Sequence, residues 1–468
     1  MPSRRLRTSP LFRRLVSAWS CPSGYRDALR IGLPLVFSMS STTLILFTDR
    51  VFLGQHSVEA LAASTPAGMA AFMFASLFLG IVTYANTFIA QFVGARREHD
   101  VGAALWHAIY LALLGGGVMA LLAFTGPGLF ALFGHAPEIQ VLEVQYFGIM
   151  MIGTVFMLMK DALACFYSGR GYTGPILWVN LLGALLNIPL DYILIHGFGR
   201  IPSYGVAGAA VASIAGQALM MLLFLVLVFR PRWRRLYGMR QWRLDRAILR
   251  DYLRYGGPAG IQFFMDVFTF AFFIAAVGRL GQAELAASNI AFALNTLAFL
   301  PMVGISVAAN TLVGQAVGSK RPEEVRRAVT SAMHIAMAWM WGVAAIYLLL
   351  PHPLIRLFQP GEVDPVLFEE VLHHGTWLLR FIAFYCLFDA MNLVYIGALK
   401  GLADTAFIGW VCFLGGLFGL VIPVFVAIEV LQAGVYVAWG MLTLYVCFLA
   451  LAFRTRFRLR AQREMALN

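Results

Sequence analysis

The chain has 468 residues, of which 60% are hydrophobic and only 12% are charged, whereas about a quarter of a typical soluble domain is charged. A soluble globular protein is therefore excluded, and a polytopic membrane protein is indicated. The formal net charge of +12 would favour a nucleic-acid partner in a soluble protein, so the positions of the basic residues decide what it means.

The N-terminal segment 1–30 is rich in arginine but contains no apolar stretch that ends in a small-residue cleavage site, so we expect no removable signal peptide. After it, apolar runs of about 20 residues predict twelve membrane-spanning helices. The predicted spans are residues 31–53, 64–93, 103–124, 141–168, 175–196, 205–229, 257–278, 285–317, 329–350, 376–398, 406–429 and 434–453.

The sequence repeats itself, because residues 30–104 align without a gap on residues 254–328. Asn86, Thr87, Gln91 and Gly94 thereby fall on Asn310, Thr311, Gln315 and Gly318. Six spans in each copy predict an all-α membrane protein with two six-helix bundles related by a pseudo-two-fold axis along the membrane normal.

We accordingly divide the chain into two lobes and three basic segments. The expected order is a basic N-terminus (1–30), a first lobe (31–229), a basic linker (230–256), a second lobe (257–453) and a basic tail (454–468). Most of the 35 Lys and Arg residues fall in the termini and in every second loop, which predicts that both termini are cytoplasmic. This topology explains the net charge, so we expect the lipid bilayer and no nucleic acid as a partner.

Three other features need interpretation, and the first two of them leave two readings open. Residues 241–253 have Arg on one side and apolar residues on another, which fits either a short interfacial helix or a solvated linker. Pro34 and Pro258, at matched places near the starts of spans 1 and 7, are candidate hinges or simply first-turn prolines. The five scattered cysteines have no metal or redox spacing, and we expect them to be packing residues.

Acidic residues inside spans indicate a function, because the insertion of an ionised side chain at mid-membrane costs at least about 2.5–3.5 kcal/mol of free energy. The helical rise of about 1.5 Å per residue, counted from the predicted span ends, places Asp49, Asp191 and Ser213 at a similar depth in the outer half of the first lobe. Asn187 precedes Asp191 by four positions and therefore shares its helix face. These oxygens predict a site for a hard cation such as Na⁺, or for a proton held between two carboxyl groups.

Asp266 and Asp389 fall nearer the midplane of the second lobe and predict a second protonatable site. Asp161 aligns with Asp389 when the two halves are compared, but Lys160 beside it offers a neutralising charge. We therefore expect Asp161 to have a structural role.

Together, these motifs resemble the multidrug and toxic compound extrusion (MATE) family over nearly the whole chain. The resemblance rests on Gly32-Leu33-Pro34 and Thr48-Asp49-Arg50-Val51-Phe52-Leu53-Gly54 in span 1, residues 90–95 at the end of span 2, Asn187-Ile188-Pro189-Leu190-Asp191 in span 5, residues 205–213 and residues 400–405. It implies two six-helix lobes around a central cleft, and export of amphipathic cations driven by inward H⁺ or Na⁺.

The resemblance also implies roles for particular residues. Asp49, Asn187, Asp191 and Ser213 would form the first-lobe cation or proton site, and Asp266 and Asp389 would be the second-lobe acids. Arg50 departs from the small or apolar residue expected beside the span 1 acid, and an ion pair with Asp49 would interfere with cation binding there. We expect a monomeric antiporter of a bacterial inner membrane, without a cofactor.

Two other classes of protein share some of these features. A flippase of a lipid-linked oligosaccharide or peptidoglycan precursor has a related bundle, but it would need more cationic residues in its cleft to meet pyrophosphate. An intramembrane enzyme would use paired aspartates, but Asp266 and Asp389 lack the Gly-rich motif expected beside an aspartyl-protease dyad.

Overall fold

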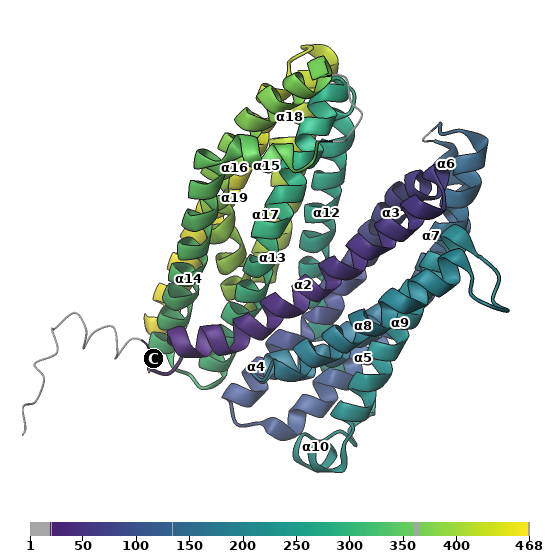
Figure 1. Ribbon diagram of the computed structural model, residues 1–468. Helices are drawn as coiled ribbons and strands as arrows, with labels where there is room; N and C mark the ends of the chain where they lie inside the picture. Colours follow the sequence, from purple (N-terminus) through teal and green to yellow (C-terminus); the bar gives the residue numbers. More distant parts are fainter. Residues whose placement is uncertain (1–18, 20, 133, 360–364, 467–468) are drawn as a thin grey trace, which may run out of the picture.

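The computed structural model describes residues 19, 21–132, 134–359 and 365–466, and it contains twelve helices long and apolar enough to cross a membrane (Figure 1). The first six spans comprise α2 (Tyr25–His56), α3 (Val58–Thr83) with α4 (Ala85–Gly94), α5 (Val101–Leu122), α7 (Pro137–Gly169), α8 (Gly174–His196) and α9 (Gly205–Val228). The last six comprise α12 (Gly257–Val277), α13 (Gln282–Gly318), α14 (Pro322–Leu349), α16 (Pro365–Gly401), α17 (Thr405–Gly416) and α19 (Val435–Ala466). The predicted number of spans and the all-α class are confirmed.

Short elements complete the chain between and within the spans. They are α6 (Gly126–Ala131), α10 (Pro231–Leu236), α11 (Arg246–Asp251), α15 (Pro351–Arg356) and α18 (Ile422–Phe425), with 3₁₀ turns at Glu98–Asp100 and Ala123–Thr125 and π-helical turns at Tyr252–Gly256, Leu417–Val421 and Val426–Val430. The π turns let α11 run on into α12, and α17 into α18, without a break in the span.

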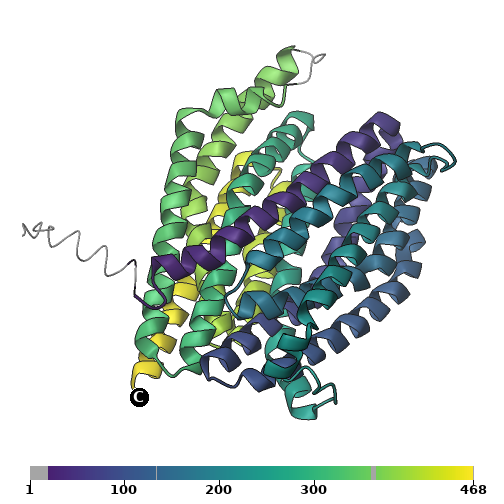
Figure 2. The same ribbon diagram turned by 60° about the horizontal axis from the view of Figure 1, so that its bottom comes forward.

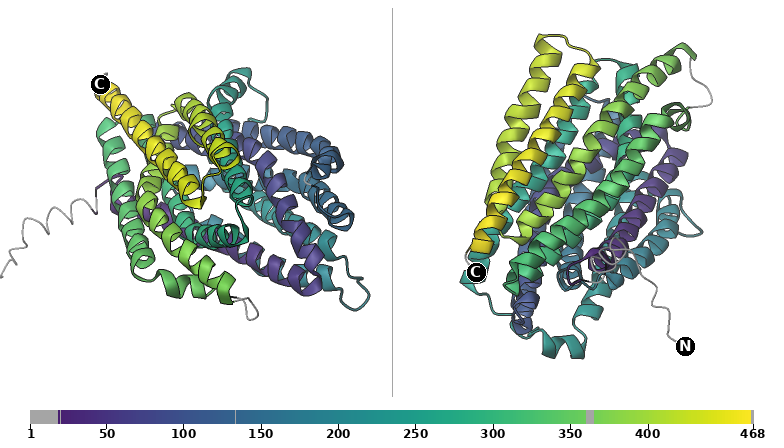
Figure 3. Two further views of the ribbon diagram at one scale, coloured as in Figure 1. Left: turned by 90° about the horizontal axis from the view of Figure 1, so that it is seen from above. Right: turned by 90° about the vertical axis from the view of Figure 1, so that its left-hand side faces the viewer.

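The spans form two six-helix lobes that meet at one end of the molecule and diverge toward the other (Figures 1 and 2). We call the end where they meet the basic end, because it carries the loops with Arg96 and Arg97, the linker after α9, and Lys320 and Arg321. The opposite end is called the far end. The C-terminal helix α19 lies wholly within the second lobe and finishes at the basic end (Figure 3).

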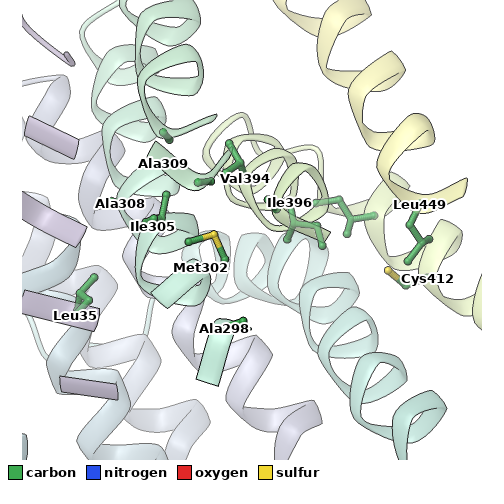
Figure 4. Packing of buried hydrophobic residues seen from close by; sticks show 14 of the residues in the cluster. Leu35, Ala298, Met302, Ile305, Ala308, Ala309, Val394, Ile396, Cys412 and Leu449 are labelled. Atoms are coloured by element: carbon green, nitrogen blue, oxygen red, sulfur yellow. The ribbon is translucent and has the colours of Figure 1, made fainter. Parts of the chain in front are cut away.

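Helix α2 connects the two lobes. It starts beside α13 and α14 of the second lobe and finishes beside α8 of the first (Figure 1). A small residue permits the close contact between α2 and α13, since a Cβ on Gly304 of α13 would lie 3.0 Å from Val36 Cγ2 of α2. Leu35 of α2 joins the apolar cluster formed by α13, α16, α17 and α19, in which Met302, Ile305, Val394 and Leu449 are buried (Figure 4).

At the basic end, residues of the internal repeat form a nearly symmetric set of hydrogen bonds between the lobes, which we call the seam. Asn86 Nδ2 donates to Thr311 Oγ1 at 3.1 Å, and Thr87 Oγ1 donates to Asn310 Oδ1 at 2.9 Å. Each member of this set is the repeat equivalent of another member. The predicted pseudo-two-fold relation is therefore visible in side-chain contacts.

Repeat-related glutamines and glycines flank the seam. Gln91 Nε2 donates to the carbonyl of Gly401, and Gln315 Nε2 donates to that of Gly169, each at 3.0 Å. A Cβ on Gly94 would lie 2.1 Å from the backbone carbonyl oxygen of Gln315, and one on Gly318 would lie 2.1 Å from the backbone carbonyl oxygen of Gln91. These two backbones approach closely because neither glycine has a side chain.

The two candidate hinge prolines occupy different local structures. Pro34 lies inside α2, where it removes the N–H that would bond the Arg30 carbonyl. Thr173 Oγ1 lies 3.5 Å from that carbonyl oxygen and donates to the Ile31 carbonyl at 2.9 Å, so it satisfies the exposed carbonyls from a neighbouring segment. Pro258 instead follows the π-helical turn Tyr252–Gly256 in the first turn of α12.

Two boundaries differ from the sequence-based expectation. Residues 241–253 do not form a separate interfacial helix, because the helix that begins at Arg246 continues into α12. The buried Tyr252 explains this course, since its hydroxyl donates to the Ala104 carbonyl at 2.8 Å and holds the segment against α5. The expected tail at 454–468 begins as a direct extension of α19, which remains helical to Ala466.

Asp404 joins this helical extension to the turn after α16. Its buried carboxylate accepts hydrogen bonds from Arg456 Nε at 2.6 Å and from Arg460 Nε at 2.8 Å. Burial alone would raise the pKa of Asp404, but these hydrogen bonds outweigh it and hold the pKa below its usual value. The two arginines thus hold the C-terminal helix against the turn that follows α16.

Candidate functional site

Three helices bring the four predicted first-lobe residues together. Asp49 lies on α2, Asn187 and Asp191 lie one turn apart on α8, and Ser213 lies on α9. The hydroxyl of Ser213 donates to Asp49 Oδ2 at 3.2 Å, and Asn187 Nδ2 donates to the Ala212 carbonyl at 3.1 Å. These hydrogen bonds join α2 to α9 and α8 to α9 at the level of the four residues.

Small residues on α9 make this geometry possible. A Cβ on Gly208 would lie 2.3 Å from the Leu194 carbonyl oxygen, and one on Gly216 would lie 3.3 Å from Asn187 Nδ2. Helices α8 and α9 can therefore approach closely along the length that carries the site. This approach brings the amide of Asn187 within reach of the α9 backbone.

The site is rich in buried oxygens that lack a donor. Asp49, Asn187 and Asp191 are 5%, 1% and 0% exposed. One oxygen each of Asp49 and Asn187 and both carboxylate oxygens of Asp191 have no hydrogen-bond partner among the described residues. The carboxyl groups of Asp49 and Asp191 are neighbours, close enough to share a proton when one of them is protonated. Buried polar atoms are normally satisfied, so this cluster fits a bound cation or proton.

Two further residues define the surroundings of these carboxyls. Arg50 is exposed, and within the described part of the chain no ion pair joins it to Asp49, so the sequence-based concern about a neutralising pair is not realised. Tyr146 of α7 is buried beside both Asp49 and Asp191. Sequence reasoning missed Tyr146, because a single tyrosine within an apolar span carries no depth or spacing signal.

The second-lobe acids are also close to each other. Asp266 on α12 accepts a hydrogen bond from Gln262, one turn before it. Asp389 on α16 lies within reach of the Asp266 charge, and so does Lys400 at the end of α16. Cys412 of α17 lies beside the Asp266 carboxyl. Lys400 is thus a cation within range of Asp266, although no Lys or Arg is adjacent to Asp266 in the sequence.

Asp161 lies outside both acid clusters. Its carboxylate pairs with Lys160 Nζ at 3.2 Å, as the adjacent charges in the sequence indicate. The register of the lobes also places Asp161 differently from the sequence comparison. Gly169 and Gly401 accept equivalent seam bonds, and this register puts Asp161 opposite Leu393, one helical turn beyond Asp389.

A twelve-helix duplicated bundle with acidic side chains inside the spans of each lobe defines a polytopic membrane protein of the transporter type. The MatE family model matches residues 34–193 and 258–425, once in each lobe, and the chain belongs to that family.

Relatives of known sequence cover most of the chain. A probable multidrug resistance protein NorM of Pseudomonas putida is 30% identical in an alignment of 398 residues that covers 82% of this chain and 84% of that protein. A probable multidrug resistance protein NorM of Pseudomonas aeruginosa is 29% identical in an alignment of 423 residues that covers 88% of this chain and 85% of that protein.

Solved structures share the fold. A multidrug resistance MATE family transporter in an outward-facing conformation superposes with a TM-score of 0.85 and 21% identity over 96% of this chain and 98% of its own. A MOP superfamily transporter from Pyrococcus furiosus, described as having a binding pocket of reverse polarity, gives a TM-score of 0.85 at 20% identity, again over 96% of this chain and 98% of its own.

Proposed function

We propose that the protein is a secondary antiporter that exports amphipathic organic cations in exchange for H⁺ or Na⁺. The observation that carries this proposal is the set of buried oxygens on Asp49, Asn187 and Asp191 that have no hydrogen-bond partner in the described part of the chain. Such a cluster costs free energy when empty and charged, so it favours a bound cation or proton. Membership of the MatE family and the relatives described as multidrug resistance proteins support the same function.

We place the basic end in the cytoplasm of a bacterial cell, with the protein in the inner membrane and both termini inside. In that orientation the lobes diverge toward the outside. Ion binding at the acids and substrate binding between the lobes would favour different lobe arrangements, which is sufficient for exchange. Pro34 and Pro258 are the points at which we expect α2 and α12 to bend. We propose that a monomer transports the substrate without chemical conversion and without a cofactor.

The test is ethidium movement in everted vesicles that contain the full chain, with a Na⁺ gradient and a pH gradient imposed separately. Asp49→Asn should abolish the movement that one of the gradients drives in the wild type. The matched control is Lys160→Gln/Asp161→Asn, which removes a neutralised pair from a span and should retain exchange. Exchange that persists in Asp49→Asn would overturn the first-lobe coupling site, and no movement under either gradient would favour the flippase.

A further inference from the structure

A cavity of about 770 Å³ opens at the basic end of the first lobe, and it shares no lining residue with either acid cluster. Its walls come from three segments: α5, the end of α9 and the linker that follows α9. The lining residues are Trp106, Leu225, Phe229, Arg234, Met239, Arg240 and Trp242. Exchange of a substrate between the lobes makes no use of this cavity.

The lining changes from apolar to basic along the chain. Leu225 and Phe229 lie at the end of the α9 span, and Arg234 and Arg240 follow in the linker beyond it. Trp106 and Trp242 complete the wall, and tryptophan is the side chain that concentrates where hydrocarbon meets the headgroup layer. The cavity therefore crosses the membrane interface at the basic end.

The positive charge of this cavity has no counterion in the described part of the chain. Arg234 and Arg240 are exposed, and among the described residues no acidic side chain forms an ion pair with either of them. At the same end, by contrast, Arg97 pairs with Asp100 at 2.6 Å and Arg321 pairs with Glu324 at 2.9 Å. The cavity thus complements an anionic ligand.

The walls are fixed in place by hydrogen bonds between the linker and α5. Trp106 Nε1 donates to the Met239 carbonyl at 2.9 Å, Gly102 N donates to the Tyr237 carbonyl at 2.8 Å, and the Tyr110 hydroxyl donates to the Trp242 carbonyl. The ring centroids of Trp106 and Phe229 are 5.4 Å apart. A ligand would therefore meet a preformed site, which lowers the entropy cost of binding.

We propose that this cavity binds one anionic phospholipid from the leaflet at the basic end. Arg234 and Arg240 would hold the headgroup phosphate, since guanidinium groups match phosphate geometry. Leu225, Phe229 and Trp106 would contact the first part of the acyl chains. The volume lies within the roughly 300–1,000 Å³ of small-ligand sites, which suits a headgroup with the adjoining glycerol. The apolar wall favours a lipid over a free anion, because a free anion would leave it in water.

The test is native mass spectrometry of the full chain in detergent, titrated with phosphatidylglycerol or with phosphatidylcholine of the same acyl chains. One phosphatidylglycerol should bind more tightly than phosphatidylcholine. Arg234→Gln/Arg240→Gln should weaken the phosphatidylglycerol affinity by about 30-fold. The control Arg235→Gln/Arg243→Gln removes the same charge from exposed linker positions outside the cavity, and it should bind like the wild type. Thermal melting in detergent verifies that each variant is folded.

Three results would overturn the proposal. Equal affinity for the two lipids would show that the arginines do not select an anion. An equal loss in the control would mean that the linker attracts anionic lipid diffusely, without a site. Inorganic phosphate that binds alone and fully displaces phosphatidylglycerol would assign the cavity to a free anion.

Discussion

Thr87 and Asn310, which lie in different lobes, are joined by a hydrogen bond of 2.9 Å from Thr87 Oγ1 to Asn310 Oδ1. Thr87 is fully buried and Asn310 is 7% exposed, so water does not readily replace either partner. The related pair Asn86 and Thr311 makes the second bond of the set. The basic end is therefore held closed by reciprocal polar contacts as well as by apolar packing.

Thr87→Val should loosen this closure. It removes the donor and leaves a buried carbonyl oxygen on Asn310 unsatisfied, which costs about 1–3 kcal/mol. We expect spin labels placed on the two lobes at the basic end to show a broader or longer distance distribution than in the wild type. Thr83→Val is the control, because the Thr83 hydroxyl bonds the Leu79 carbonyl of its own helix. An unchanged distribution in Thr87→Val would show that this bond does not hold the lobes together.

Gly318→Ala should destabilise the protein strongly. The added Cβ would lie 2.1 Å from the Gln91 oxygen, so α4 and α13 would have to move apart. Overpacking of this kind costs about 1–3 kcal/mol. Gly117→Ala is the control, since a Cβ there would meet no atom of the described residues within 4 Å and alanine favours the helix. Melting in detergent should show a lower midpoint for Gly318→Ala and an equal or higher one for Gly117→Ala.

Asp404→Asn should destabilise the protein in a pH-dependent way. The pKa of Asp404 is lowered in the folded state, so its ion pairs contribute stability above the unfolded pKa of about 3.9 and lose it as pH falls through the folded value. At pH 7 we expect a loss of about 1–3 kcal/mol for the variant. The difference in melting midpoint between wild type and variant should be constant from pH 7 to about 5 and then shrink below about pH 4. A difference that grows on acidification would contradict this role.

Ser213→Ala should weaken ion coupling without abolishing it. The variant loses the 3.2 Å hydrogen bond to Asp49 but keeps both carboxyl groups of the site. A neutral hydrogen bond is worth about 1 kcal/mol, so the ion concentration for half-maximal exchange should rise about fivefold. Ser213→Thr retains the hydroxyl and should restore the wild-type value in the same vesicle assay. Failure of threonine to restore it would assign the effect to packing.

The sequence predicted the number of spans, the duplication and the common level of Asp49, Asp191 and Ser213 in the first lobe, because hydropathy and helical rise are local properties. It did not predict which residues of the repeat touch. The match of Asn86 with Asn310 established equivalence, whereas the bonds join Asn86 to Thr311 and Thr87 to Asn310.

The surroundings of the second-lobe acids were beyond prediction for a related reason. The proximity of Lys400 and Cys412 to Asp266 depends on how α17 packs against α12 and α16, which no spacing within one helix encodes. The linker course depends likewise on tertiary hydrogen bonds to α5, among them those from Tyr252 to the Ala104 carbonyl and from Trp106 to the Met239 carbonyl.

The two ends of helix α2 lie against different lobes, so a bend within α2 would move one lobe relative to the other. From Pro34 to His56 it extends about 33 Å along the helical rise, which makes the proline the fulcrum of a long arm. By geometry alone, a change of about 10° in direction at Pro34 would displace the His56 end by about 6 Å, roughly one helical turn. Asp49 lies between Pro34 and His56 on this helix. Its distance from Asn187 and Asp191 on α8 would therefore change with the angle between the lobes.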